Sequence, residues 1–244
     1  MSILLPLYVY PWTSAAKKHP DVDFTVVVNP CSGPCVESVP YQYYLDAIPQ
    51  LRQYNIRTLG YVATNYTTKP LDDVLKEIDT YAAWPKVSNN TKLRVDGIFF
   101  DETLPPSQAA KNGTRFRDRF VVHNPGLIPA ALLTLPSFPA QSYTNLSDIT
   151  VIFEETFDKW LNRTTFDALQ SHRIPRSKLA VILHSLPDLS KRVLDFVVEQ
   201  VQEAADCVFL TDVKVKDEYY HGFSGMFEDL VRSVDGGAEG WEEK

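Results

Sequence analysis

Paired carboxylates follow two short apolar runs of this sequence. Asp101 and Glu102 come directly after residues 97–100, and Glu154 and Glu155 follow a second such run. Sugar hydrolysis needs two carboxyl groups, because one protonates the leaving oxygen while the other attacks as a nucleophile or activates water. We therefore treat Asp101, Glu102 and Glu154 as candidate catalytic residues and assign no individual roles to them.

Each of these acids also has a structural interpretation. A carboxylate after an apolar strand is often only a helix cap or a solvated loop residue. The pair Asp101 and Glu102 is the stronger signal, since two adjacent carboxylates end a very apolar run. Side chains alternate in direction along a strand, so one of the two is expected to point into the site and the other over its rim. Glu154 is favoured over Glu155 because it follows the second run immediately.

Aromatic, amide and imidazole side chains stand at similar positions. The candidate substrate-binding residues are Tyr8, Tyr10, Asn29, Tyr61, Asn124 and His184. Aromatic rings can pack against the faces of sugars. Structural alternatives exist here too, because Asn29 and Asn124 each precede a proline and can cap a turn. His184 can equally be a core histidine, and the first two tyrosines can be core or rim aromatics.

Several other reaction classes lack their signatures in this chain. There is no Ser-His-Asp or Cys-His pattern, and no lysine ends an apolar run where it would form a Schiff base. No histidine stands at zinc-ligand spacing from the cysteines. We expect neither a metal site nor a cofactor.

Eight apolar runs recur along the chain and alternate with loops and helical patterns. The runs are continuous, which is typical of strands buried on both faces by helices. They cover residues 4–10, 24–29, 57–63, 97–101, 120–123, 149–154, 179–184 and 207–211, and helical patterns cover 43–51, 71–82, 157–169, 189–204 and 218–231. Strand and helix in alternation predict a parallel sheet with right-handed crossovers.

Eight such units predict an α/β fold, a (β/α)8 TIM-type barrel over residues 1–235, followed by a polar tail at 236–244. An open doubly wound sheet is the alternative, but no Gly-rich phosphate loop follows the first run. The crossovers at 11–22 and 103–119 are short, so the helices after strands one and four are expected to be shortened or missing. The active site of such a barrel lies at the carboxyl ends of its strands, where the candidate residues stand.

Composition narrows the range of partners. The net charge of −7 and the absence of a Lys/Arg cluster make nucleic acid an improbable partner, and an acidic surface suits a neutral or cationic substrate better. No apolar stretch reaches the roughly 18 residues of a membrane helix. The first residues are predicted to form a strand rather than a signal peptide, which predicts a cytoplasmic chain unless the natural N-terminus is longer.

The three cysteines and five glycosylation sequons also bear on localisation. Cys31 and Cys35 are interpreted as free thiols, with a bridge between them as the alternative in an oxidising compartment. The sequons at Asn65, Asn89, Asn112, Asn145 and Asn162 matter only if the chain is secreted.

Five ordered segments together resemble the spherulin-4-like family along nearly the whole chain. They are residues 4–11 (LLPLYVYP), 26–30 (VVVNP), 58–64 (TLGYVAT), 96–102 (DGIFFDE) and 123–126 (HNPG). That family includes fungal barrel glycoside hydrolases acting on galactosaminogalactan, an α-1,4-linked polymer of N-acetylgalactosamine and galactosamine. The resemblance implies an endo-acting hydrolase with catalytic carboxylates at Asp101 and Glu102, and with Glu154 as a further acid at the end of a later strand.

The chain departs from that family in its two short crossovers, where members usually carry longer helical segments. The short crossovers motivate an alternative hypothesis beside the preferred hydrolase: a non-catalytic carbohydrate-binding or sporulation-associated barrel, as a shortened isoform or gene model. The sequence leaves the oligomeric state open.

Overall fold

The structure is a computed structural model of the chain, and it describes residues 1–7, 12–54, 56–103, 120–126, 147–162, 167, 169, 174–214, 222 and 224–236. Eight parallel strands follow one another around a closed barrel in chain order. They are β1 (Ser2–Leu7), β2 (Asp23–Val28), β3 (Arg57–Ala63), β4 (Gly97–Asp101), β5 (Phe120–Asn124), β6 (Ile149–Thr156), β7 (Leu179–His184) and β8 (Cys207–Leu210). The predicted (β/α)8-type barrel is confirmed.

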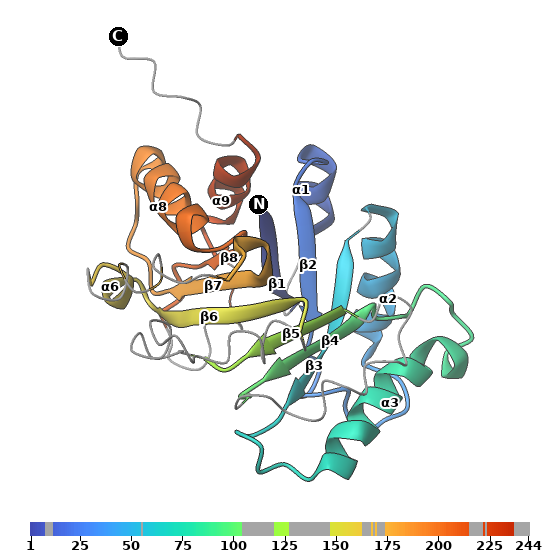
Figure 1. Cartoon of the computed structure of the whole chain (residues 1–244). Helices are drawn as coiled ribbons and strands as arrows, with labels where there is room; N and C mark the ends of the chain where they lie inside the picture. Colours follow the sequence, from blue (N-terminus) through green and yellow to red (C-terminus); the bar gives the residue numbers. More distant parts are fainter. Residues whose placement is uncertain are drawn as a thin grey trace.

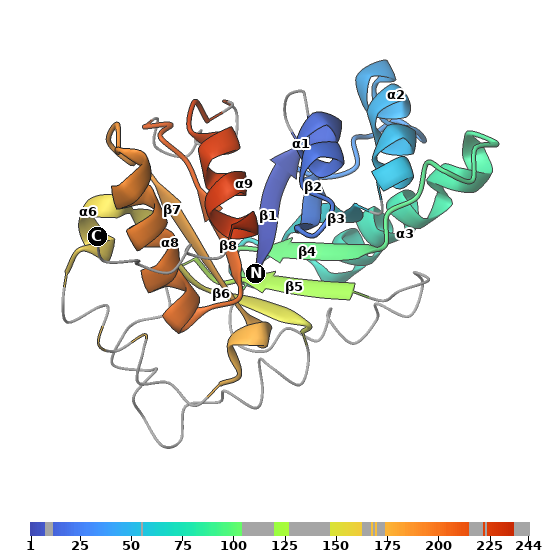
Figure 2. The ribbon, with the colours of Figure 1, turned by 90° about the horizontal axis from the view of Figure 1, so that it is seen from above.

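Helices lie around the outside of the barrel (Figures 1 and 2). They are α1 (Trp12–Lys18), α2 (Gln42–Leu51), α3 (Leu71–Val87), α6 (Phe157–Trp160), α8 (Lys191–Ala204) and α9 (Phe227–Asp235), with short 3-10 turns η1 (Arg52–Tyr54) and η3 (Arg176–Lys178). The helix after the first strand is short, as predicted, with seven residues in α1. The crossover after the fourth strand, predicted to lack a full helix, lies outside the described residues.

Apolar residues on both faces of the strands explain this arrangement. The interior faces fill the barrel, while the outer faces pack against the helices. Gly60 shows how closely a helix packs on the outer face of the strands, because a Cβ atom on it would lie 2.7 Å from the ring of Tyr81 on α3. Tyr81 also donates a hydrogen bond to the carbonyl oxygen of Val28, so α3 is fixed to two neighbouring strands.

The barrel closes between its first and last strands and between its first and last helices. The register pairs Ser2 of β1 with Cys207 of β8, and the Ser2 amide donates to the Asp206 carbonyl at 2.8 Å. Outside the strands, α1 and α9 lie side by side (Figure 1), and Lys18 forms an ion pair with Glu228 at 3.1 Å. The short α1 therefore still covers the seam.

An ion pair lies at the amino ends of β3 and β4. Arg52 of η1 donates to both carboxylate oxygens of Asp96 at 2.7 Å, and Asp96 also accepts the backbone N–H of Thr58 at 2.8 Å. The two bonds from this one guanidinium nitrogen and the backbone bond satisfy the buried carboxylate of Asp96. The ion pair thus stabilises the amino end of the barrel, which lies opposite the carboxyl ends of the strands where the candidate acids stand.

Two of the helices predicted from the sequence differ from those in the structure. The segment predicted to be helical over 218–231 is a turn at Ser224 to Met226, and α9 begins only at Phe227. The Ser224 hydroxyl accepts the backbone N–H of Met226, and Gly225 follows this serine directly, which favours a turn over a helix. The segment predicted over 157–169 is interrupted after Trp160, where Leu161 forms a turn, and Asp167 and Leu169 are helical again.

The interpretation of Cys31 and Cys35 as free thiols was also wrong, because the two form a disulfide with Cα atoms 5.0 Å apart. The intervening loop turns back tightly, with φ angles of 51° at Ser32 and 147° at Gly33, and this brings the two side chains together. Cys207 is buried and free.

No helix in the described part of the chain combines the length and the apolar character needed to cross a membrane.

Candidate active site

Asp101 is the last residue of β4 and points into the barrel. It shares this direction with Phe99, which lies two residues earlier and stacks on Tyr61 of β3 with ring centroids 6.1 Å apart. Three groups donate hydrogen bonds to its carboxylate: the Tyr61 hydroxyl at 2.6 Å, the Asn124 amide at 2.8 Å and the backbone N–H of Glu102 at 2.9 Å. The carboxylate is therefore held in one orientation.

Burial raises the pKa of Asp101 from 3.8 to about 7. The negative charge of Glu154 adds to this increase, and the charge of Glu102 contributes a smaller part. The hydrogen bonds from Tyr61 and from the Glu102 backbone act in the opposite direction, because they stabilise the charged form. Asp101 can therefore hold a proton at neutral or weakly acidic pH.

Asn124, the last residue of β5, connects the two predicted acids. Its Nδ2 atom donates to Asp101 Oδ1 at 2.8 Å and to Glu154 Oε2 at 2.6 Å. These two oxygens therefore lie within about 5.4 Å of each other, the sum of the two bond lengths. The amide is held in this orientation because its Oδ1 accepts the backbone N–H of Gly126 at 3.0 Å. Asn124 thus caps a turn and also bridges the carboxylates.

Of the two adjacent glutamates on β6, only Glu154 bonds to this cluster among the described hydrogen bonds. Phe153 packs on Trp160 outside the barrel, with ring centroids 5.5 Å apart, so its neighbour Glu154 points inward. Glu155 instead accepts the backbone N–H of Thr156 at 2.9 Å. A register shift between Val151 and Phe153 accompanies this orientation.

Glu102 has a left-handed backbone, with φ at 51°, and a half-buried side chain. Thr64, directly after β3, stabilises this conformation, since its hydroxyl donates to the Glu102 carbonyl at 2.7 Å and its N–H donates to the Asp101 carbonyl at 2.9 Å. The sequence reasoning missed Thr64. Its position one residue beyond a strand was the available signal.

The remaining predicted site residues have different surroundings. His184 is half-buried at the end of β7, and its register places it on the inward face, two residues beyond Ile182, the partner of Glu154. Its Nδ1 lies 3.0 Å from the Ser185 hydroxyl. Asn29 is buried and accepts the Gly33 backbone N–H at 2.9 Å, so it caps the disulfide loop. Tyr8 and Tyr10 lie outside the described residues.

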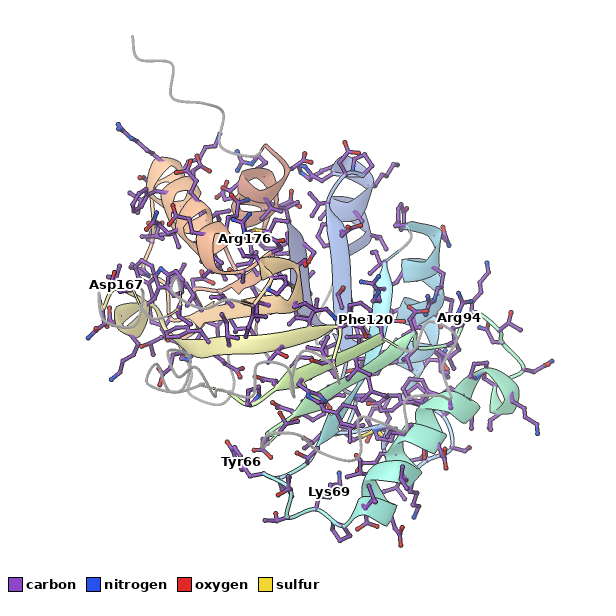
Figure 3. All side chains as sticks on the ribbon, in the orientation of Figure 1. Tyr66, Lys69, Arg94, Phe120, Asp167 and Arg176 are labelled. Atoms are coloured by element: carbon purple, nitrogen blue, oxygen red, sulfur yellow. A yellow bond between two sulfur atoms is a disulfide. The ribbon has the colours of Figure 1, made fainter. Side chains whose placement is uncertain are left out.

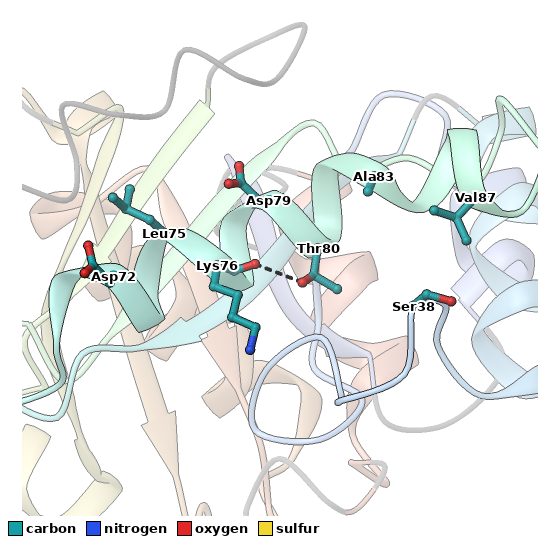
Figure 4. Close-up of a pocket in the computed structure, with 8 residues that line it drawn as sticks. All are labelled: Ser38, Asp72, Leu75, Lys76, Asp79, Thr80, Ala83 and Val87. Atoms are coloured by element: carbon teal, nitrogen blue, oxygen red, sulfur yellow. Dashed lines mark hydrogen bonds between the residues drawn. The ribbon is translucent and has the colours of Figure 1, made fainter.

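A shallow pocket lies away from the mouth of the barrel, on the outer surface of α3 (Figure 4). It measures about 450 Å³ and is lined by helical residues including Asp72, Leu75, Lys76 and Asp79, with Ser38 on the opposite side. It holds none of the candidate residues. Among the described residues, no group of three or more His, Cys, Asp or Glu side chains is placed to hold a metal ion.

A closed barrel of eight parallel strands, with a half-buried aspartate and a half-buried glutamate at its carboxyl end, makes the chain a TIM-type barrel protein with an acidic mouth. The chain belongs to the Spherulation-specific family 4, whose family model matches residues 2–234. The resemblance noted in the sequence is therefore confirmed.

Two relatives illustrate this membership. Spherulin-4 of Physarum polycephalum is 31% identical over 160 residues, which make up 64% of this chain and 45% of that protein, so the match spans less than half of the relative. The crystal structure of Aspergillus clavatus Sph3 in complex with GalNAc is 36% identical, with a TM-score of 0.83, and the match covers 96% of this chain and 97% of that one.

More distant structures share the fold alone. Chitinase RmChi1 from Rhizomucor miehei is 11% identical with a TM-score of 0.50, and the match covers 96% of this chain and 98% of that one. An endo-beta-N-acetylglucosaminidase from Cordyceps militaris is 10% identical with a TM-score of 0.51, covering 96% and 89% of the two chains.

Proposed function

We propose that the protein is a glycoside hydrolase that cleaves an α-1,4-linked polysaccharide of N-acetylgalactosamine and galactosamine at internal bonds. The observation that carries this proposal is the half-buried pair Asp101 and Glu154, joined by one amide nitrogen at the mouth of the barrel. The binding of GalNAc by the similar Sph3 supports the sugar class. The negative charge of the chain favours a polymer that carries free amino groups.

Asp101 serves as the general acid in this proposal. Its pKa of about 7 keeps the carboxyl group protonated in weakly acidic solution, so that it can donate the proton to the glycosidic oxygen as the bond breaks. Tyr61, whose hydroxyl lies 2.6 Å away, holds the group in position.

Glu154 serves as the nucleophile, or as the carboxylate that stabilises the developing positive charge of the sugar. Carboxyl groups about 5–5.5 Å apart are typical of retaining glycosidases, whereas inverting enzymes need a wider gap for water. The spacing to Asp101, within about 5.4 Å between the bonded oxygens, therefore favours retention of configuration. Glu102, at the rim, contacts the sugar hydroxyl or amino groups.

The direct test is to incubate the purified protein with galactosaminogalactan and to follow released oligosaccharides by mass spectrometry. Glu154→Gln and Asp101→Asn should each lower kcat by about 10²-fold or more, since each removes a group that acts in the transition state. Glu102→Gln should lower activity as well.

Glu155→Gln is the matched control, because it removes the neighbouring carboxylate that bonds to the Thr156 backbone rather than to the cluster. It should retain activity within about twofold. Full activity of Glu154→Gln would remove Glu154 from the mechanism. Saturable binding of the polymer with no change in its size, seen by viscometry, would instead favour the non-catalytic binding protein.

A further inference from the structure

Tyr66 lies on the loop that follows β3, beside the paired acids. Its backbone N–H donates to the carbonyl oxygen of Glu102 at 2.7 Å, which fixes this part of the loop against the end of β4. Figure 3 shows the Tyr66 side chain projecting from the ribbon at the arrowhead end of β4. The residue is 52% exposed.

The backbone at this position is unfavourable for a bulky residue. Asn65, Tyr66 and Thr67 have φ angles of 47°, 50° and 70°, three consecutive non-glycine residues in the left-handed region. Such a conformation destabilises the chain by about 1 kcal/mol or more for a residue other than Gly, Asn or Asp. Hydrogen bonds hold it in place, since Lys69 N donates to the Thr64 carbonyl at 3.2 Å and the Thr68 hydroxyl donates to the Asn65 carbonyl at 2.6 Å.

A loop that needed only this turn would be more stable with glycine at position 66. The tyrosine ring offsets only part of the unfavourable backbone energy, because half of its surface remains in contact with solvent. An exposed ring, carried next to the candidate acids by a strained and hydrogen-bonded backbone, is the arrangement expected of a residue that contacts substrate.

We propose that Tyr66 is a substrate-binding residue whose ring stacks against a sugar of the polysaccharide in the subsite beside Asp101 and Glu102. The inference rests on the proposed function. A hexopyranose ring presents C–H groups on its face, and these pack on a flat aromatic ring, while the phenol hydroxyl at the edge can bond to a sugar hydroxyl or amine. The hydrogen bond from the Tyr66 backbone N–H to the Glu102 carbonyl holds the Tyr66 backbone against the end of β4, next to the acids.

The experiment compares Tyr66→Ala, Tyr66→Gly, Tyr66→Phe and Tyr66→Trp in affinity electrophoresis on gels that contain galactosaminogalactan, and in steady-state hydrolysis of the same polymer. Tyr66→Ala and Tyr66→Gly should raise both the dissociation constant and KM about tenfold, with kcat within about twofold, because the ring binds substrate without touching the reacting atoms. Tyr66→Phe and Tyr66→Trp should stay within about threefold of the wild type.

Two controls separate binding from folding. Phe196→Ala removes an aromatic ring of similar exposure, 51%, from the outer face of α8, and should change neither constant. Tyr66→Gly should melt at the same temperature as the wild type or higher, because glycine relieves the left-handed backbone.

The outcomes distinguish this inference from the proposed function. Unchanged gel retardation and KM in Tyr66→Ala would overturn the role of Tyr66, even if the wild type cleaves the polymer. A wild type that does not cleave would overturn the hydrolase. In that case the gel assay still tests the ring, since weaker retardation of the alanine variant supports stacking and equal retardation refutes it.

Discussion

At the scale of single residues, the environment of Asp101 contains opposing influences. Three donors favour its charged form, yet burial and the nearby charge of Glu154 outweigh them and raise the pKa to about 7. A general acid of a glycosidase needs this balance, because it must be protonated before the bond breaks and must remain in a fixed position. Tyr61 provides the position and reduces the rise in pKa.

Tyr61→Phe therefore provides a test with a defined sign. Loss of the hydroxyl removes a hydrogen bond that lowers the pKa of Asp101, so the pKa should rise. The wild-type kcat/KM should fall above about pH 7 as the acid loses its proton. In the variant this alkaline limb should move to higher pH by up to about one unit, together with a lower maximum rate.

Tyr81→Phe is the control for this pH profile. Its hydroxyl bonds to the Val28 carbonyl on the outer side of the barrel, so its removal should lower stability by about 1 kcal/mol and leave the alkaline limb unchanged. An alkaline limb that stays at the wild-type pH in Tyr61→Phe would mean that a group other than Asp101 is the acid.

The positions of the candidate acids were predictable from sequence, but the contacts between them were not. Asp101 and Glu154 are recognisable because each ends a continuous apolar run. The link through Asn124 and the support from Thr64 depend on the register between strands distant in sequence. The disulfide was missed because it depends on the left-handed residues between Cys31 and Cys35, and two thiols in a short loop can point together or apart.

At the scale of elements, strands were predicted better than helices. The limits of β3, β4 and β7 match the sequence prediction residue for residue, because buried parallel strands are continuous apolar runs with polar ends. The start of α9 was placed too early because amphipathic spacing alone does not reveal the turn at Ser224. Helix ends depend on such local hydrogen bonds, which the apolar pattern does not encode.

Gly60→Ala tests how closely α3 packs on the barrel. The added methyl group would lie 2.7 Å from the Tyr81 ring, so the ring or the helix must move. We expect the free energy of unfolding to fall by about 1–3 kcal/mol in urea titrations. In a chain that already carries Tyr81→Leu, the same Gly60→Ala substitution should lower the free energy of unfolding by less than it does in the wild type. Equal losses in both backgrounds would show that the clash involves another group.

At the scale of the whole molecule, the two ends of the barrel have different roles. The amino end contains the Arg52–Asp96 ion pair, which stabilises the starts of β3 and β4. The carboxyl end holds Asp101 and Glu154 close together, where their proximity is unfavourable as both become charged. The fold thus tolerates an electrostatic penalty at the mouth that the proposed hydrolysis would require, and this penalty should be visible in global stability.

The penalty predicts how stability changes with pH. The pKa of Asp101 is about 7 in the folded chain against 3.8 as its ordinary value, so between these values the folded state binds the proton more tightly. The contribution of this group to stability is fully present below about pH 4 and is lost as pH rises towards 7. Asp101→Asn has no proton to lose. Its Tm relative to the wild type should therefore increase by a few degrees between pH 4 and pH 8, as measured by calorimetry.

Glu155→Gln changes a carboxylate outside the cluster, and its Tm difference from the wild type should stay constant over the same range. If the Asp101→Asn difference were equally constant, Asp101 would titrate at its ordinary pKa in the folded chain, and its role as the acid would lose its physical basis.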